Sequence, residues 1–96
     1  MTRAERTYLE EKLFTNLDND LRLRVEKLLQ KYEEMHQMFP DIHEVNFGIK
    51  FCNLILKHKS NKKPNYKYLI FQTHETQTSY YLYRKQILEH INSIVN

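Results

Sequence analysis

The chain has 96 residues, with 15 Lys and Arg against 12 Asp and Glu, and it contains one Cys, one Gly, two Pro and no Trp. This length allows a single domain, residues 1–96, and the lone Cys excludes a disulfide framework or a multi-cysteine zinc site. One Gly excludes a glycine-rich phosphate-binding loop, and no apolar run reaches the roughly 18 residues of a membrane span. The charged start of the chain lacks the apolar core of a signal peptide, so we expect a cytoplasmic protein.

The first helix is expected over residues 3–15. Thr2 and Glu5 have the spacing of a capping box, in which each side chain satisfies a free backbone amide of the other. Leucines recur every four residues, at Leu9, Leu13 and Leu17. The sequence TNLDND then ends the helix, because its side chains compete for backbone hydrogen bonds.

The second helix has the most regular pattern in the chain and ends at Pro40. Its apolar residues are spaced alternately by four and three, at Leu21, Val25, Leu28, Tyr32, Met35 and Phe39. Such heptads form either a coiled-coil seam between two chains or one wall of an ordinary core. Because a domain this small buries little surface by itself, we predict a homodimer. Its interface is expected at Leu21, Val25, Leu28, Tyr32 and Met35.

Residues 41–59 fit two conformations. As a helix, Asp41 and Glu44 form a capping box, and one face carries Ile42, Val45, Ile49, Cys52 and Leu56. As a strand, apolar residues alternate from Val45 to Phe51, and Gly48 marks a bulge. Gly costs only about 1 kcal/mol in a helix, so the end signals and the face favour a helix.

The C-terminal third is expected to form a β-hairpin and a last helix. Residues 66–73, YKYLIFQT, are rich in β-branched and aromatic residues, HETQT resembles a turn, and SYYLYRK resembles a return strand. The spacing of Tyr83, Ile87 and Ile91 predicts a helix over residues 84–95.

These elements predict an α+β fold, mostly helical with a β-hairpin, in the winged-helix-like order α-α-α-β-β-α. In that arrangement the helix before the hairpin enters the major groove of DNA. The alternative, with residues 43–58 as a strand, is α-α-β-β-β-α. Over residues 19–96 that order resembles the outline of a double-stranded-RNA-binding domain, although the lysine cluster of that family is reduced here to Arg84 and Lys85.

No pattern of catalytic or metal-binding residues is found. His43-Glu44 and His74-Glu75 do not extend to the HExxH spacing that binds zinc. Cys52 lies among apolar residues, which is typical of a small core residue rather than a nucleophile. We therefore predict that the protein is not an enzyme, and we expect no catalytic residue, metal, cofactor or small-molecule substrate.

The charge is unevenly distributed, and this favours a nucleic-acid partner. Residues 1–48 carry seven Lys and Arg against ten Asp and Glu, whereas residues 49–96 carry eight against two. Lysines that neutralise phosphates release counterions and so drive binding, and Asn and Lys on one helical face can read base edges. The predicted contacts are Asn46, Lys50, Asn53, Lys57, Lys59, Lys62, Lys63 and Lys67.

An interaction with a larger protein is the alternative function. Tyrosines fall on both faces of the expected hairpin, and exposed Tyr beside Arg is typical of interface hot spots. The predicted interface residues are Tyr66, Tyr68, Tyr81, Tyr83 and Arg84. The Lys-, Asn-, Ile- and Tyr-rich composition is typical of small phage or mobile-element proteins. The two functions expected are thus a regulator of transcription or replication that binds DNA and an inhibitor that blocks a host protein.

Overall fold

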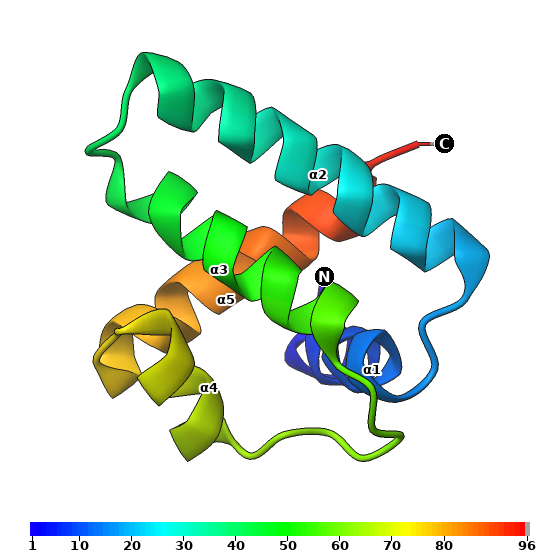
Figure 1. Cartoon of the computed structure of the whole chain (residues 1–96). Helices are drawn as coiled ribbons and strands as arrows, with labels where there is room; N and C mark the ends of the chain where they lie inside the picture. The colour runs from blue at the N-terminus through cyan, green and yellow to red at the C-terminus, as the bar shows by residue number, and fades with distance from the viewer. Residues whose placement is uncertain (96) are drawn as a thin grey trace.

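The computed structural model describes residues 1–95, which form five α-helices and no strand (Figure 1). The helices are α1 (Arg3–Thr15), α2 (Asn19–Met38), α3 (His43–Lys57), α4 (Tyr66–Thr73) and α5 (Gln77–Ser93). The predicted α+β fold is therefore wrong in both forms. Because α3 is a helix, the three-stranded alternative is excluded. Because α4 and α5 are helices, the hairpin of the winged-helix prediction is excluded as well.

The first two helices both begin at a side-chain cap, and the cap of α1 is the predicted one. The backbone amide of Thr2 donates to Glu5 Oε1 at 2.8 Å, and the amide of Glu5 donates to Thr2 Oγ1 at 3.1 Å, which completes the capping box of α1. Asp18 caps α2 by accepting a hydrogen bond from the amide of Leu21 at 2.9 Å. The predicted capping box of α3 is wrong, because Ile42 occupies its N-cap position and no side chain caps it.

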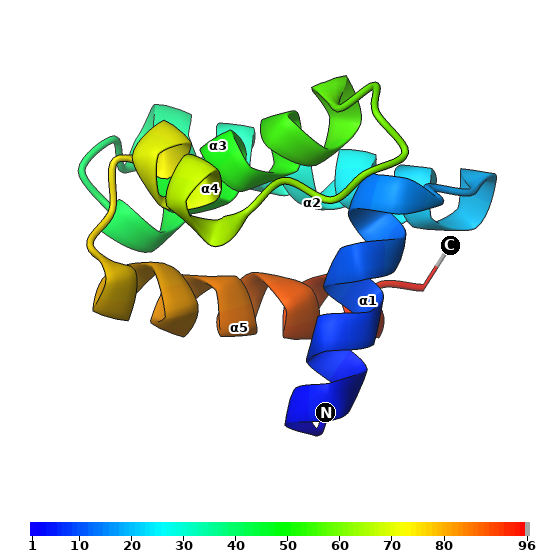
Figure 2. The same cartoon turned by 90° about the horizontal axis from the view of Figure 1, so that it is seen from below.

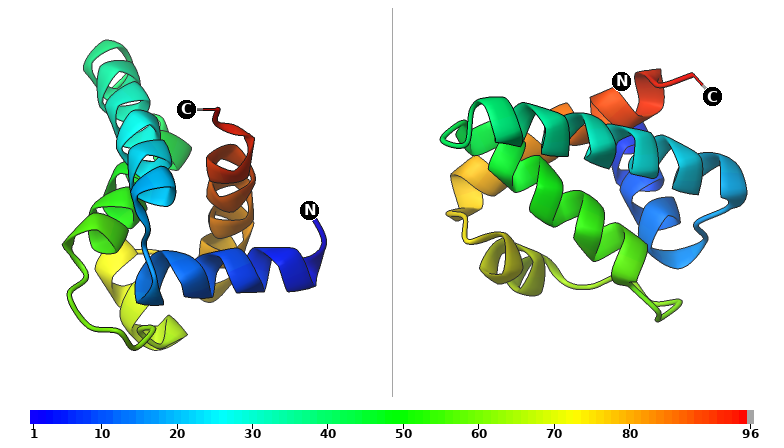
Figure 3. Two further views of the ribbon diagram at one scale, coloured as in Figure 1. Left: turned by 90° about the vertical axis from the view of Figure 1, so that its right-hand side faces the viewer. Right: turned by 45° about the horizontal axis from the view of Figure 1, so that its top comes forward.

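The heptad face of α2 packs inside the chain. Leu21, Val25, Leu28 and Tyr32 are buried, and Met35 is partly buried against the same cluster. Figures 1 and 3 show α2 and α3 side by side and running in opposite directions. The predicted dimer-interface residues thus form part of the core of a single chain. They are covered by the chain's own helices, so they do not support the predicted homodimer.

Gly48 allows α2 and α3 to approach closely. A Cβ atom at this position would lie only 2.6 Å from Cε2 of the Tyr32 ring, closer than two carbon atoms pack. Gly48 therefore allows two helices to pack closely. It does not form the β-bulge that the strand interpretation predicted.

The predicted hairpin is replaced by α4, a tight turn and the start of α5. Asn65 caps α4 by accepting from the amide of Tyr68 at 2.9 Å, and Thr76 caps α5 in a capping box with Ser79. Between them His74 adopts the left-handed conformation, with φ of 57°, and its amide donates to carbonyls of the last turn of α4. The C-terminal helix predicted over residues 84–95 is present, but it spans Gln77–Ser93 and includes the residues predicted as the return strand.

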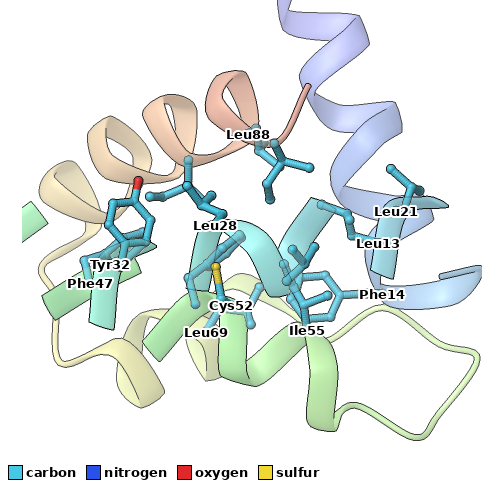
Figure 4. Close-up of a cluster of buried hydrophobic side chains, with 14 of the residues drawn as sticks. Leu13, Phe14, Leu21, Leu28, Tyr32, Phe47, Cys52, Ile55, Leu69 and Leu88 are labelled. Carbon is cyan, nitrogen blue, oxygen red and sulfur yellow. The ribbon is translucent and has the colours of Figure 1, made fainter. Parts of the chain in front are cut away.

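The helices form two layers with α1 across one end. Figure 2 shows α5 running beneath α2 and α3, while α1 crosses near the C-terminal half of α5. The side chains between the layers form one apolar core, part of which is drawn in Figure 4, with Leu13, Leu28, Cys52 and Leu88 among them. No helix within residues 1–95 is long and apolar enough to cross a membrane.

Candidate anion-binding pocket

A pocket of about 550 Å³ lies between the C-terminal half of α3, the α3–α4 connection (residues 58–65) and α4. Figure 1 shows this connection leaving the end of α3 and returning beneath it to α4. We call the space the lysine pocket. It is lined by Phe14, Ile49, Lys50, Asn53, Leu54, Lys57, His58, Lys59, Ser60, Pro64, Tyr68, Leu69 and Gln72.

The lining combines positive charge with an apolar base. Three lysines contribute charge, and none of the lining residues in the described chain is acidic. Asn53 and Gln72 add carboxamides that can both donate and accept hydrogen bonds. Ile49, Leu54 and Pro64 are only partly buried and also line the pocket, so the polar groups lie beside an apolar surface. Such a pocket suits an anionic ligand that also has a flat or apolar part.

Helix α3 brings the charged residues together through its period. Lys50, Asn53 and Lys57 are three and four residues apart and therefore lie on one face of the helix. The predicted polar stripe is helical, and this part of it faces the pocket. The opposite side of α3 packs into the core through Cys52 and Ile55, which are buried.

The α3–α4 connection is held in place by contacts at both ends. The ring nitrogen Nε2 of His58 hydrogen-bonds to the carbonyl of Lys62 at 2.8 Å, and the His58 ring packs edge-on against Phe14 with centroids 5.5 Å apart. The amide of Lys62 donates to Ser60 Oγ at 3.1 Å. These contacts fix the turn that carries Lys59.

A buried ion cluster anchors the far end of the connection. Glu10 of α1 is fully buried, and its two carboxylate oxygens pair with Arg84 of α5 and with Lys63, whose Nζ lies 2.5 Å from Oε1. Lys63 also donates to Tyr66 Oη at 3.1 Å and lies over the Tyr66 ring. Burial disfavours the charged form of Lys63, but its hydrogen bonds to Glu10 and Tyr66 outweigh this effect and raise its pKa.

The structure divides the predicted nucleic-acid contacts into two groups. Lys50, Asn53, Lys57 and Lys59 line the lysine pocket together. The others do not line it: Asn46, Lys62, Lys63 and Lys67. Asn46 donates to the carbonyl of Pro40 at 3.1 Å and closes the α2–α3 turn, and Lys63 is held by Glu10.

The predicted protein-interface residues do not form one surface. Arg84 is buried against Glu10, and Tyr83 is half-buried between His43 and Phe47. Tyr66 packs against Tyr80 and Tyr81. Tyr81 remains 36% exposed, and Tyr68 remains 48% exposed at the edge of the lysine pocket.

Three residues of this region have no role in the sequence-based interpretation: His58, Gln72 and Glu10. Gln72 lies four residues after Tyr68, so a helical assignment of residues 66–73 would have placed both on one face. No local pattern in the sequence indicates that Glu10 is buried, because its burial depends on the packing of α1 against α5.

Within residues 1–95, no group of three or more His, Cys, Asp or Glu side chains is arranged to hold a metal ion. Comparisons with protein-family models, curated protein sequences and solved structures found no match to this chain.

Proposed function

We propose that this protein binds nucleic acid and that the lysine pocket is its main contact surface. The observation that carries the proposal is the position of Lys50, Lys57 and Lys59 around one pocket with no carboxylate in its lining. Positive side chains without a neighbouring acid gain most by pairing with an external anion. Nucleic acid supplies phosphates at regular spacing, and their neutralisation releases counterions.

Salt dependence tests this mode of binding. Three phosphate contacts predict that the logarithm of the binding constant falls against the logarithm of salt concentration with a slope of about −2 to −3. Fluorescence anisotropy with labelled DNA at several salt concentrations measures this slope. No binding at low salt, or binding that is insensitive to salt, would refute the proposal.

A matched pair of triple variants separates the pocket from the general charge of the chain. The variant K50Q/K57Q/K59Q removes the three pocket lysines, and we expect a weaker affinity and a slope near zero. The control R22Q/K31Q/K85Q removes the same charge at exposed positions on α2 and α5. Equal losses in the two variants would show that only net charge matters.

Two exposed aromatic residues favour a second candidate function, binding to another protein. Phe71 is 74% exposed and Tyr68 is 48% exposed, and both belong to α4. Exposed aromatic side chains are common at interface hot spots. On this alternative, Phe71→Ala prevents the capture of a single dominant protein partner, while K50Q/K57Q/K59Q captures it normally.

A further inference from the structure

We infer that the lysine pocket takes single-stranded nucleic acid, with one unstacked base placed against Tyr68 and the flanking phosphates on the lysines. This inference rests on the proposed function, and it names the form of nucleic acid that the site recognises.

The shape of the site disfavours a duplex. Reading a major groove requires a helix or a β-ribbon that projects from the protein. Here α3 packs through one side into the core, and Lys50, Asn53 and Lys57 line a pocket that the α3–α4 connection and α4 also line. The hairpin that would contact the flanking DNA backbone is absent from residues 1–95. A recessed surface admits a base that has left its stack more readily than a double helix.

The chemistry of the lining fits a nucleotide. Tyr68 supplies a half-exposed aromatic ring on which a base can stack without regard to its sequence. Asn53 and Gln72 offer donors and acceptors to the edge of an unpaired base. Lys50, Lys57 and Lys59 surround these groups, where the phosphates on either side of the base pass. The volume of about 550 Å³ lies within the range of sites that enclose small organic ligands.

The position of Tyr68 explains why an aromatic residue remains exposed on a short helix. The neighbouring residue Leu69 is fully buried and holds α4 on the core, so the Tyr68 ring is not needed to fix the helix. Its ring lines the lysine pocket beside Gln72, four residues further along the same helix.

Binding of three fluorescein-labelled probes tests the inference on the full chain. The probes are a ten-nucleotide oligothymidine, a ten-base-pair duplex, and an oligonucleotide of the same length as the first with abasic sites throughout. We expect the oligothymidine to bind about tenfold more tightly than the abasic strand, because only the former offers bases to stack. We also expect it to bind more tightly than the duplex.

Variants at Tyr68 assign the base contact. Tyr68→Leu should weaken oligothymidine binding about tenfold and leave abasic-strand binding unchanged, whereas Tyr68→Phe should retain the affinity because it keeps the ring. Circular dichroism and thermal melting confirm that each variant is folded. Equal losses of Tyr68→Leu on the oligothymidine and the abasic strand would overturn the inference.

The outcomes distinguish this inference from the proposed function. Duplex binding as tight as that of the oligothymidine, with a loss in K50Q/K57Q/K59Q, would overturn the single-strand inference and leave nucleic-acid binding in place. Absence of binding to all three probes at low salt would refute both.

Discussion

The ion cluster around Glu10 makes this residue the most sensitive polar position in the chain. The Glu10 side chain is fully buried, and the side chains of Arg84 and Lys63 are 9% and 22% exposed. The substitution Glu10→Gln keeps the size of the side chain and removes its charge. Arg84 then remains charged in a site that water reaches poorly, between α1 and α5.

The magnitude follows from the exposure of the two cations. Removing one partner of a buried ion pair costs about 3–5 kcal/mol, because the other charge stays desolvated. Lys63 is exposed enough to turn toward water, so its share is that of a surface pair, about 0–1 kcal/mol. Since the amide oxygen of Gln can still accept a hydrogen bond from Arg84, we expect a loss near the lower limit, about 3 kcal/mol. This is a large part of the roughly 5–15 kcal/mol that stabilises a domain of this kind.

Urea denaturation followed by circular dichroism measures this loss as a fall in the transition midpoint at an unchanged slope. The double variant Glu10→Leu/Arg84→Leu provides the matched comparison, because it removes both charges and leaves apolar side chains in their place. We expect the double variant to be more stable than Glu10→Leu alone.

Two results would refute this reasoning. A loss below about 1 kcal/mol for Glu10→Gln would show that Arg84 regains water in the folded state. Additive losses in the Glu10→Leu/Arg84→Leu cycle would show that the two side chains are not coupled.

Two further predictions concern the core. Gly48→Ala gains about 1 kcal/mol of helix propensity but forces a Cβ atom against the Tyr32 ring, which costs about 1–3 kcal/mol. Urea denaturation should show a net destabilisation in the native sequence and a stabilisation in a Tyr32→Leu background; the same sign in both would contradict the packing. Burial raises the pKa of Cys52 to about 12, so very little thiolate is present at pH 8, and a disulfide reagent at that pH should react almost entirely with unfolded protein. Rapid reaction of the folded protein would disprove its burial.

Local sequence signals located most of the helices. The predicted capping box of Thr2 and Glu5 lies at the start of α1, because a cap depends on residues only three positions apart. The heptads of α2 identified its apolar face correctly. They did not distinguish a dimer seam from an internal core, because both bury the same side chains and differ only in what covers them.

The same kind of signal failed in the C-terminal third. Residues 66–73 have the composition of a strand, yet they form α4. Strand propensity reflects packing on a sheet more than an intrinsic backbone preference, and no partner strand exists in the described chain. Asn65 and Thr76 cap α4 and α5 in the structure, but the sequence-based prediction rested on the aromatic composition of residues 66–73 and 79–85.

By itself, the sequence determined the first three helices and the concentration of basic charge in the second half, because each depends on composition or short spacing. Only the tertiary structure decided which lysines lie together. Lys50, Lys57 and Lys59 meet Tyr68 around one pocket because the α3–α4 connection folds back beneath α3. Lys63 belongs to the same lysine-rich stretch, but it pairs with Glu10, a residue 53 positions earlier. Pairing over such a distance depends on how α1 packs on α5, and no local pattern contains that information.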